Sequence, residues 1–160
     1  MKKSILLLLA VVLSCNVFAQ FDASKLRVGG GLVFASEVNN IGLTFNGVYT
    51  ITEEIEGAFA ISHIFENDYV SSTIFDFDGH YIFHQQDSKL NFYGIAGLAV
   101  TSWKSDIPYL GDYSNSELGL NIGVGANYKL SDNLNLAPEA RFTIEDNSYF
   151  RIGASIQYMF

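Results

Sequence analysis

The last eleven residues, Phe150-Arg151-Ile152-Gly153-Ala154-Ser155-Ile156-Gln157-Tyr158-Met159-Phe160, alternate in character with a period of two. Counting back from Phe160, every second residue is apolar or aromatic, whereas the interleaved positions include Arg151, Ser155 and Gln157. Successive side chains of a β-strand point to opposite faces. This stretch therefore predicts a strand with one apolar face and one polar face.

The same alternation recurs along the chain between short turn-like segments, which is the pattern of consecutive strands. The facing of one segment, 90–101, stays open because both of its residue sets are largely apolar. Pro138 cannot donate to a strand ladder and weakens the prediction of an unbroken pairing in its own segment. The predicted strands before the terminal one are 25–35, 41–52, 55–65, 72–84, 90–101, 117–130 and 134–145.

Eight strands of roughly 11–13 residues are long enough to cross a bilayer when tilted. An even number of antiparallel strands can close into a barrel without free edges, the only β arrangement that hydrocarbon tolerates. If segment 134–145 were turned over, Arg141 would face lipid at a cost of about 2–4 kcal/mol. The sequence thus predicts an all-β fold, an eight-stranded antiparallel up-and-down transmembrane β-barrel with its apolar faces outward.

The first nineteen residues have the pattern of a secretory signal peptide. Lys2 and Lys3 precede the apolar run 5–13, and Val17-Phe18-Ala19 offers a small-residue cleavage site. We expect 1–19 to be removed and 20–160 to form the barrel domain in the outer membrane. Val12-Leu13-Ser14-Cys15 resembles a weak lipoprotein site, so lipidation at Cys15 is the alternative. The formal net charge of −8, without clustered Lys or Arg beyond Lys2-Lys3, argues against a nucleic-acid partner.

An eight-stranded lumen is only wide enough to be filled by side chains. The polar faces carry charges of both signs, so we expect an internally paired polar network and no wide channel. Its predicted members are Arg27, Glu56, Asp76, Asp78, His80, Lys129, Glu139, Arg141, Glu145 and Arg151.

Together, the signal sequence, the eight segments and the terminal Phe160 resemble the small outer-membrane β-barrel domain proteins, similar in architecture to OmpA and OmpX. The motifs that carry the resemblance are Phe-Asp-Phe-Asp-Gly-His-Tyr at 75–81, Phe-Tyr-Gly-Ile-Ala-Gly-Leu at 92–98 and Pro-Glu-Ala-Arg-Phe-Thr at 138–143. The resemblance implies an N-terminus and short turns on the periplasmic side, longer loops outside, and assembly by the barrel-insertion machinery reading the last strand, with Tyr158 and Phe160 as the signal. Only the connection 102–115 is long enough for a surface-contact loop, with Trp103, Tyr109 and Tyr113 as candidate contact residues, so we expect no large protruding strands.

Neither a metal site nor a catalytic site emerges from the sequence. Asp76, Asp78 and His80 are spaced about 6.8 Å apart along one strand face, too far to meet around one ion without help from neighbouring strands. Ser62 and His63 are adjacent in a strand and point to opposite faces, so they cannot act as nucleophile and base. We therefore expect no enzyme and no cofactor.

Three functions are candidates, the third less favoured than the others, and the extracellular partner is open. The first is a structural or surface-interaction protein in outer-membrane lipid, and the second a narrow porin-like passage for small solutes. The third, a lipid-modifying enzyme, lacks a convergent triad and an N-terminal amphipathic helix. A soluble lipocalin-like carrier would need an apolar lumen and a polar outer face, which is the reverse of the observed pattern.

Overall fold

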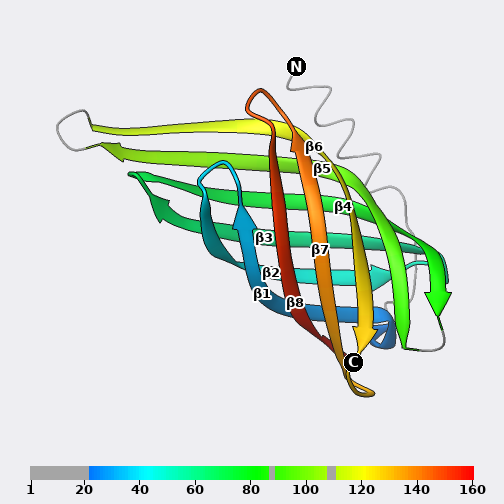
Figure 1. The fold of residues 1–160 in the computed structure, drawn as a ribbon. Helices are drawn as coiled ribbons and strands as arrows, with labels where there is room; N and C mark the ends of the chain where they lie inside the picture. Colours follow the sequence, from blue (N-terminus) through cyan, green and yellow to red (C-terminus); the bar gives the residue numbers. More distant parts are fainter. Residues whose placement is uncertain (1–21, 87–88, 108–110) are drawn as a thin grey trace.

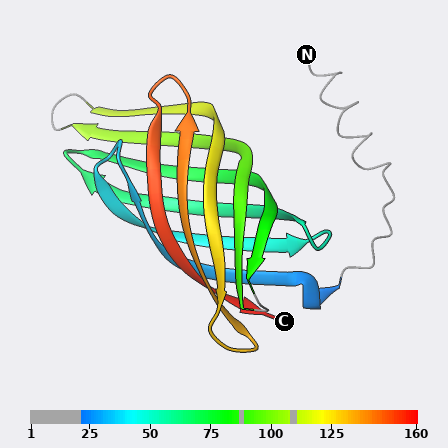
Figure 2. The ribbon, with the colours of Figure 1, turned by 45° about the vertical axis from the view of Figure 1, so that its right-hand side comes forward.

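A computed structural model describes residues 22–86, 89–107 and 111–160, and the predicted signal peptide, Cys15 and Tyr109 lie outside these ranges. After a short 3-10 turn, η1 (Ala23–Lys25), the chain forms eight strands that pair in sequence order and close into a barrel (Figures 1 and 2). No helix in the described part is long and apolar enough to cross a membrane. The strands are β1 (Leu26–Ala35), β2 (Asn40–Thr50), β3 (Ile55–Asn67), β4 (Val70–Gln86), β5 (Leu90–Ile107), β6 (Gly111–Lys129), β7 (Leu134–Ile144) and β8 (Tyr149–Met159).

The terminal strand closes the barrel. β8 pairs antiparallel with β7 on one side and with β1 on the other, in a register that runs from Arg27↔Met159 to Ala35↔Arg151. Every sequential pair is antiparallel, so the up-and-down topology predicted from the alternation is confirmed.

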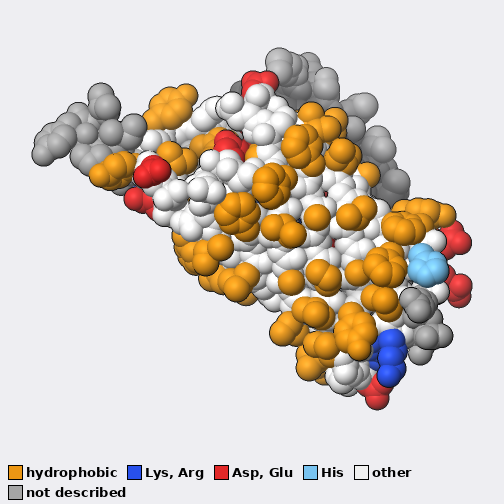
Figure 3. Space-filling model, in the orientation of Figure 1, with side chains coloured by type: hydrophobic (Ala, Val, Ile, Leu, Met, Phe, Trp, Pro, Cys, Tyr) orange, Lys and Arg blue, Asp and Glu red, His pale blue; other side chains and the backbone are white. Residues whose placement is uncertain are grey.

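The alternation separates an apolar outer wall from a largely polar interior. Phe45 and Ile152 on the outer wall are 67% and 55% exposed, whereas Asp76 and Arg151 inside are 1% and 3% exposed. Figure 3 shows hydrophobic side chains spread over the middle of the barrel wall, with the acidic side chains near its ends. The predicted facing of the strands is therefore confirmed.

The facing of strand β5, which the sequence left open, is settled by the structure: one of its two largely apolar residue sets lies inside the barrel and the other lies on the outer wall. Tyr93, Ile95, Ala99 and Thr101 are buried inside, while Phe92 and Leu98 are exposed on the outer wall. Near the end of the barrel that carries the β1–β2 turn, Ala99 joins an apolar cluster with Val33, Ala35, Val38, Ile64, Ile74 and Tyr149.

Three strands are longer than the sequence predicted. β4, β5 and β6 contain 17, 18 and 19 residues, so that segment 102–115 is mainly strand and not a loop. Only 108–110 between them fall outside the described residues. In Figure 1 the β5 and β6 strands reach to the left, well beyond the β7–β8 turn. The expectation of a long loop and no protruding strands was wrong, because these residues mix polar side chains with Trp103, Ile107 and Tyr113 and lack the regular apolar and polar alternation of the other segments.

Pro138 lies within a continuous β7 and perturbs only one of its two ladders. Pro138 pairs with Ala154 of β8, whereas on the β6 side the register passes from Gly125↔Glu139 to Tyr128↔Leu136 without pairing Pro138. This position matches its missing N–H donor.

Candidate functional site

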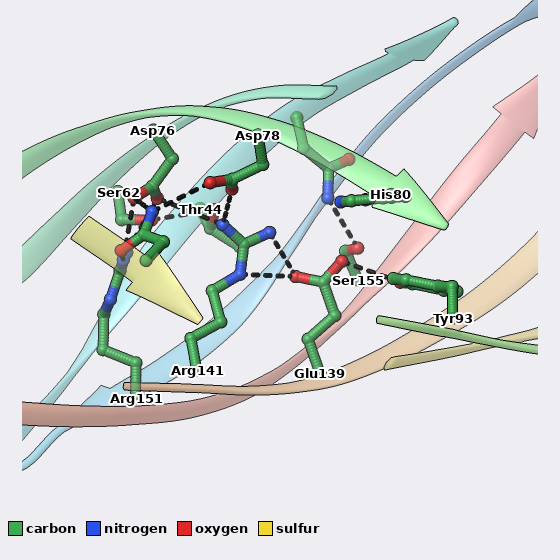
Figure 4. A network of polar contacts seen from close by, with 12 residues as sticks. Thr44, Ser62, Asp76, Asp78, His80, Tyr93, Glu139, Arg141, Arg151 and Ser155 are labelled. Carbon is green, nitrogen blue, oxygen red and sulfur yellow. Dashed lines mark hydrogen bonds and ion pairs between the residues drawn. The ribbon is translucent and has the colours of Figure 1, made fainter. Parts of the chain in front are cut away.

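The candidate site is a network of charged side chains that fills the lumen, drawn in Figure 4. It is built from strands that are far apart in sequence, because inward-facing residues of all eight strands meet along the barrel axis. Asp76, Asp78 and His80 come from β4, Glu139 and Arg141 from β7, and Arg151 from β8.

Arg151 and Asp76 form the most buried ion pair. The Arg151 Nη1 and Nη2 groups each donate to a different Asp76 carboxylate oxygen, both at 2.7 Å. Arg151 Nη2 also lies 3.2 Å from Asn121 Oδ1, and Asn121 Nδ2 donates in turn to Asp76 at 2.8 Å and Asp78 at 3.0 Å. The two aspartates are thus held by an arginine and an amide, which satisfies carboxylates that burial would otherwise destabilise.

Arg141 connects the Arg151–Asp76 pair to Glu139 and Tyr93. Its guanidinium donates to Asp78 and, through Nη2, to Glu139 at 2.6 Å, and it lies 3.6 Å from Asp76. Glu139 also accepts a hydrogen bond of 2.7 Å from the Tyr93 hydroxyl group. A single arginine therefore bridges carboxylates of β4 and β7.

His80 lies between the two halves of the network. Its ring stacks on that of Tyr93, with centroids 4.5 Å apart and planes 17° apart, and it is 2% exposed. Its Nδ1 is 3.7 Å from Glu56 Oε2, and neither ring nitrogen has a hydrogen-bond partner. Its nearest contacts in the described structure are thus the face of the Tyr93 ring and the Glu56 carboxylate.

Arg27 and Glu56 close the network toward the end that carries η1. Arg27 donates to both Glu56 oxygens at 2.8 Å, a bidentate pair, while Thr50 Oγ1 lies 3.3 Å from Glu56 Oε1. Arg27 Nε also lies 3.3 Å from Gln157 of the terminal strand.

The lumen is packed and nearly neutral. Three arginines face four carboxylates, and a cavity of about 30 Å³ lies near Arg141, Arg151, Thr44 and Ser62. That volume holds about one water molecule. Within the described residues, no group of three His, Cys, Asp or Glu side chains is placed to hold a metal ion.

The other end of the lumen carries a separate acidic group, Glu37, Glu117 and Glu145. Each has one buried carboxylate oxygen without a hydrogen-bond partner. Burial, followed by the negative charges of Glu145 and Glu117, raises the pKa of Glu37 to about 8. Burial is also the largest cause that raises the pKa of Glu145, against a hydrogen bond of 3.1 Å from Thr101.

Seven of the ten predicted network residues form ion pairs with one another, and the other three do not. Glu145 belongs to the acidic end group and contacts Thr101. Lys129 lies at the η1 end of the lumen, where its side chain is 39% exposed and pairs with Asp132 of the adjoining turn at 3.2 Å. His80 lies in the lumen without a hydrogen bond. The seven that interact as charges are Arg27, Glu56, Asp76, Asp78, Glu139, Arg141 and Arg151.

The candidate contact residues and the terminal aromatics also have defined places. Trp103 is in β5, where its ring packs edge-on against Tyr149 with centroids 5.9 Å apart. It therefore belongs to the barrel interior and not to a surface loop. Tyr113 is 69% exposed on β6, and Tyr158 and Phe160 pack against each other on the outer wall.

Sequence reasoning missed several neutral members of the network. Tyr93, Asn121 and Thr143 are buried in it. The position of Asn121 on a polar strand face was a usable signal, whereas Tyr93 lies on the strand of undecided facing. Gln157, which the alternation of the terminal strand places on its lumen face, is buried in the network as expected. Ser62 and His63 face opposite sides, with Ser62 donating to Thr44 inside and His63 pairing with Thr73 outside.

Structural comparison places this barrel among solved outer-membrane proteins. The N-terminal β-barrel domain of Pseudomonas aeruginosa OprF matches with a TM-score of 0.70 over 84% of this chain and 96% of that one, at 17% identity. The chain has the fold of the small eight-stranded outer-membrane barrels. Neisserial surface protein A matches with a TM-score of 0.69 at 16% identity, over 85% of this chain and 97% of that one.

Another eight-stranded outer-membrane barrel also matches. Ail, the attachment invasion locus protein of Yersinia pestis, gives a TM-score of 0.62 at 15% identity, covering 84% of this chain and 96% of that one. Neither a protein-family model nor a curated protein matches the sequence.

Proposed function

We propose that this chain is an integral protein of the bacterial outer membrane, a barrel whose lumen is closed by its own ion pairs and whose role is structural or one of surface interaction. The observation that carries the proposal is the combination of an apolar outer wall with a lumen crossed by Arg151–Asp76, Arg141–Asp78 and Arg27–Glu56 pairs. Outer-membrane barrels of the same fold support the location. Cleavage of 1–19 and recognition of Tyr158 and Phe160 by the assembly machinery are part of this proposal.

The location is tested by fractionation and gel mobility. Protein from the outer-membrane fraction, loaded without boiling, is expected to run as a compact, faster band that shifts after boiling. Recovery in the soluble periplasm, with the same mobility before and after boiling, would contradict the proposal.

A closed lumen predicts little conductance. In planar bilayers of neutral lipid we expect no large steady current, because the remaining cavity of about 30 Å³ admits about one water molecule. A narrow passage for small solutes is the alternative, and liposome swelling that falls with increasing solute size would favour it. We propose no catalytic role, since Ser62 and His63 point to opposite sides of the wall.

The protruding β5–β6 hairpin favours the surface-interaction role over a purely structural one. Its β6 strand continues nine residues beyond the last pair with β7, Leu120↔Ile144, which is about 30 Å of strand. A purely structural barrel needs no such extension. Shortening the hairpin by removing 104–113 tests this division: the compact unboiled band is expected to persist while cell-surface contacts of the protein are lost.

A further inference from the structure

The turn between β1 and β2, residues 36–39, is fastened to the two strands that flank this hairpin. On the β8 side, Ser36 N donates to Phe150 O at 3.0 Å, and Phe150 N donates to Ser36 Oγ at 3.1 Å. On the β3 side, Asn67 Nδ2 donates to Val38 O at 3.0 Å. A few hydrogen bonds thus hold the turn in one position relative to the barrel.

The turn also inserts an apolar side chain into the lumen. Val38 is 5% exposed and belongs to the apolar cluster to which β1, β3, β4, β5 and β8 contribute. Trp103 of β5 packs against the same cluster and edge-on against Tyr149. Because these strands surround the lumen, Val38 points inward from the turn and covers this end. We call residues 36–39 the cap.

The cap brings a carboxyl group toward two others from the opposite wall. Burial, followed by the negative charges of Glu145 next to β7 and Glu117 on β6, raises the pKa of Glu37 to about 8. Asp146 adds a further negative charge beside Glu145, and Arg151, the basic group that acts on Glu145, is already bound in the lumen ion pair. At neutral pH the closed cap therefore favours a protonated Glu37.

The strands on the remaining sides supply no charge that would hold an ionised Glu37 in place. On β8 the titratable side chain at this end is Tyr149, whose hydroxyl group lies 2.8 Å from Thr101 Oγ1. The inward side chains that β3, β4 and β5 place here are uncharged, namely Ile64, Ser72, Ile74, Thr101 and Trp103.

The closed cap leaves buried polar atoms without partners. One carboxylate oxygen of each of the three glutamates is buried without a hydrogen bond. The same holds for the indole N–H of Trp103 and for the hydroxyl group of Ser72, its register partner on β4. Water would satisfy these groups if the cap lifted, so they destabilise the closed form. Burial of Val38 and the hydrogen bonds of the turn oppose them, which leaves two forms of similar free energy.

We propose that residues 36–39 form a proton-controlled cap, closed while Glu37 is protonated and displaced from the lumen when its carboxylate faces those of Glu117 and Glu145. The contribution of Glu37 to closure is fully present below pH 4.5 and is lost as the pH rises through about 8. The inference goes beyond the proposed function, which concerns the ion pairs. Asp76 lies one inward position deeper on β4 than Ile74 of the apolar cluster, so the ion pairs keep the lumen closed when the cap lifts.

The chain contains a single tryptophan, so its fluorescence reports on Trp103 under the cap. The full-length barrel in nanodiscs of neutral phosphatidylcholine is quenched with acrylamide between about pH 5 and pH 9, below the ordinary titration of tyrosine. We expect the quenching constant to rise about twofold or more across this range, because displacement of the cap admits the quencher to Trp103. The compact unboiled gel band is expected to persist at both ends of the range.

Three variants assign the response to the cap. Glu37→Gln stays neutral, so its quenching should stay low at every pH. Glu66→Gln is the matched control, because it removes an exposed carboxylate at the same end and should keep the wild-type response. Val38→Asp places a charge in the apolar cluster, so its quenching should be high at every pH while the compact band is retained.

A flat profile of the wild-type chain would overturn the inference, and so would a pH response that Glu37→Gln leaves unchanged. Equal loss of the response in Glu66→Gln and Glu37→Gln would also overturn it, because surface charge in general would then be the cause. The unboiled gel separates these results from failure of the proposed function. A wild-type chain without the compact band contradicts the proposed function itself.

Discussion

Arg151 on β8 donates two hydrogen bonds of 2.7 Å to Asp76 on β4 across the lumen, although the residues are 75 positions apart. Both side chains are almost completely buried, at 3% and 1% exposed. A buried pair of this kind ties opposite walls of the barrel together, and removing one partner leaves an uncompensated charge in the interior.

The substitution Asp76→Asn should therefore destabilise the barrel by about 3–5 kcal/mol, because Arg151 loses its charge partner. Urea unfolding in lipid vesicles, followed by Trp103 fluorescence, measures the change. Asp132→Asn, which breaks the exposed pair with Lys129, is the matched control and should cost at most about 1 kcal/mol. Equal effects of the two substitutions would show that the lumen pair contributes nothing beyond a surface pair.

Gly125 sits against the ring of Tyr93, and a methyl group added there would lie 2.6 Å from the Tyr93 hydroxyl oxygen. Gly125→Ala should destabilise the barrel by about 1–3 kcal/mol through overpacking. At Gly47 an added methyl group would meet nothing within 4 Å, so Gly47→Ala is the control and should be neutral or slightly stabilising. Combining Gly125→Ala with Tyr93→Leu should recover part of the loss, and an absence of recovery would argue against a clash with that ring.

Glu37 should make the stability of the barrel end that carries the β1–β2 turn depend on pH. Its pKa is raised from 4.5 to about 8 by burial and by Glu145 and Glu117, so the folded state holds a proton that the unfolded state releases. The contribution of Glu37 to stability is then fully present below pH 4.5 and is lost as the pH rises through about 8. Glu37→Gln stays neutral, and its thermal midpoint should gain on wild type across this window. Glu53→Gln in an exposed turn controls for loss of one charge, and a parallel gain there would contradict the assignment.

The outward side chains of β6 change from apolar at Leu118 to polar at Ser116, and charge insertion can locate the membrane boundary relative to this change. Val124→Arg, near the middle of the outer wall, should cost about 2–4 kcal/mol, whereas Ser116→Arg should cost about 0–1 kcal/mol. Both residues are exposed on the outward face of β6, so the comparison varies depth alone. Unfolding titrations in vesicles of one lipid give the two values, and similar costs would move the membrane boundary outward past the hairpin.

Strand facing was predictable wherever a charged residue alternated with aromatics, as at Phe75 to His80, because only one face of such a strand tolerates lipid. The facing of β5 was not, since Tyr93 inside and Phe92 outside are equally apolar. Tyr93 enters the lumen because its hydroxyl group reaches Glu139 on another strand, a contact that no local pattern contains.

The ends of the long strands were hidden for a related reason. From Tyr113 to Ser116 the side chains on both faces of β6 are exposed. Tyr113, Ser114 and Asn115 therefore lack the alternation of apolar and polar residues that identified the other strands, and their sequence resembles that of a loop. Lys129 has the correct facing for the lumen but lies at its rim, where Asp132 is nearer than any interior carboxylate. Register and depth, which decide both points, are set by pairing between strands.

The pairing pattern of the lumen constrains the order in which the barrel can be completed. Asp76 and Asp78 are synthesised with β4, but the arginines that neutralise them arrive on β7 and β8. A half-made sheet that ended at β6 would hold these two carboxylates without their arginines, with hydrogen bonds from Asn121 of β6 alone, and an unpaired buried charge costs several kcal/mol. Transfer of the barrel into the bilayer should therefore be more favourable after β7 and β8 have joined the sheet. The lumen charges would thus disfavour the insertion of incomplete chains.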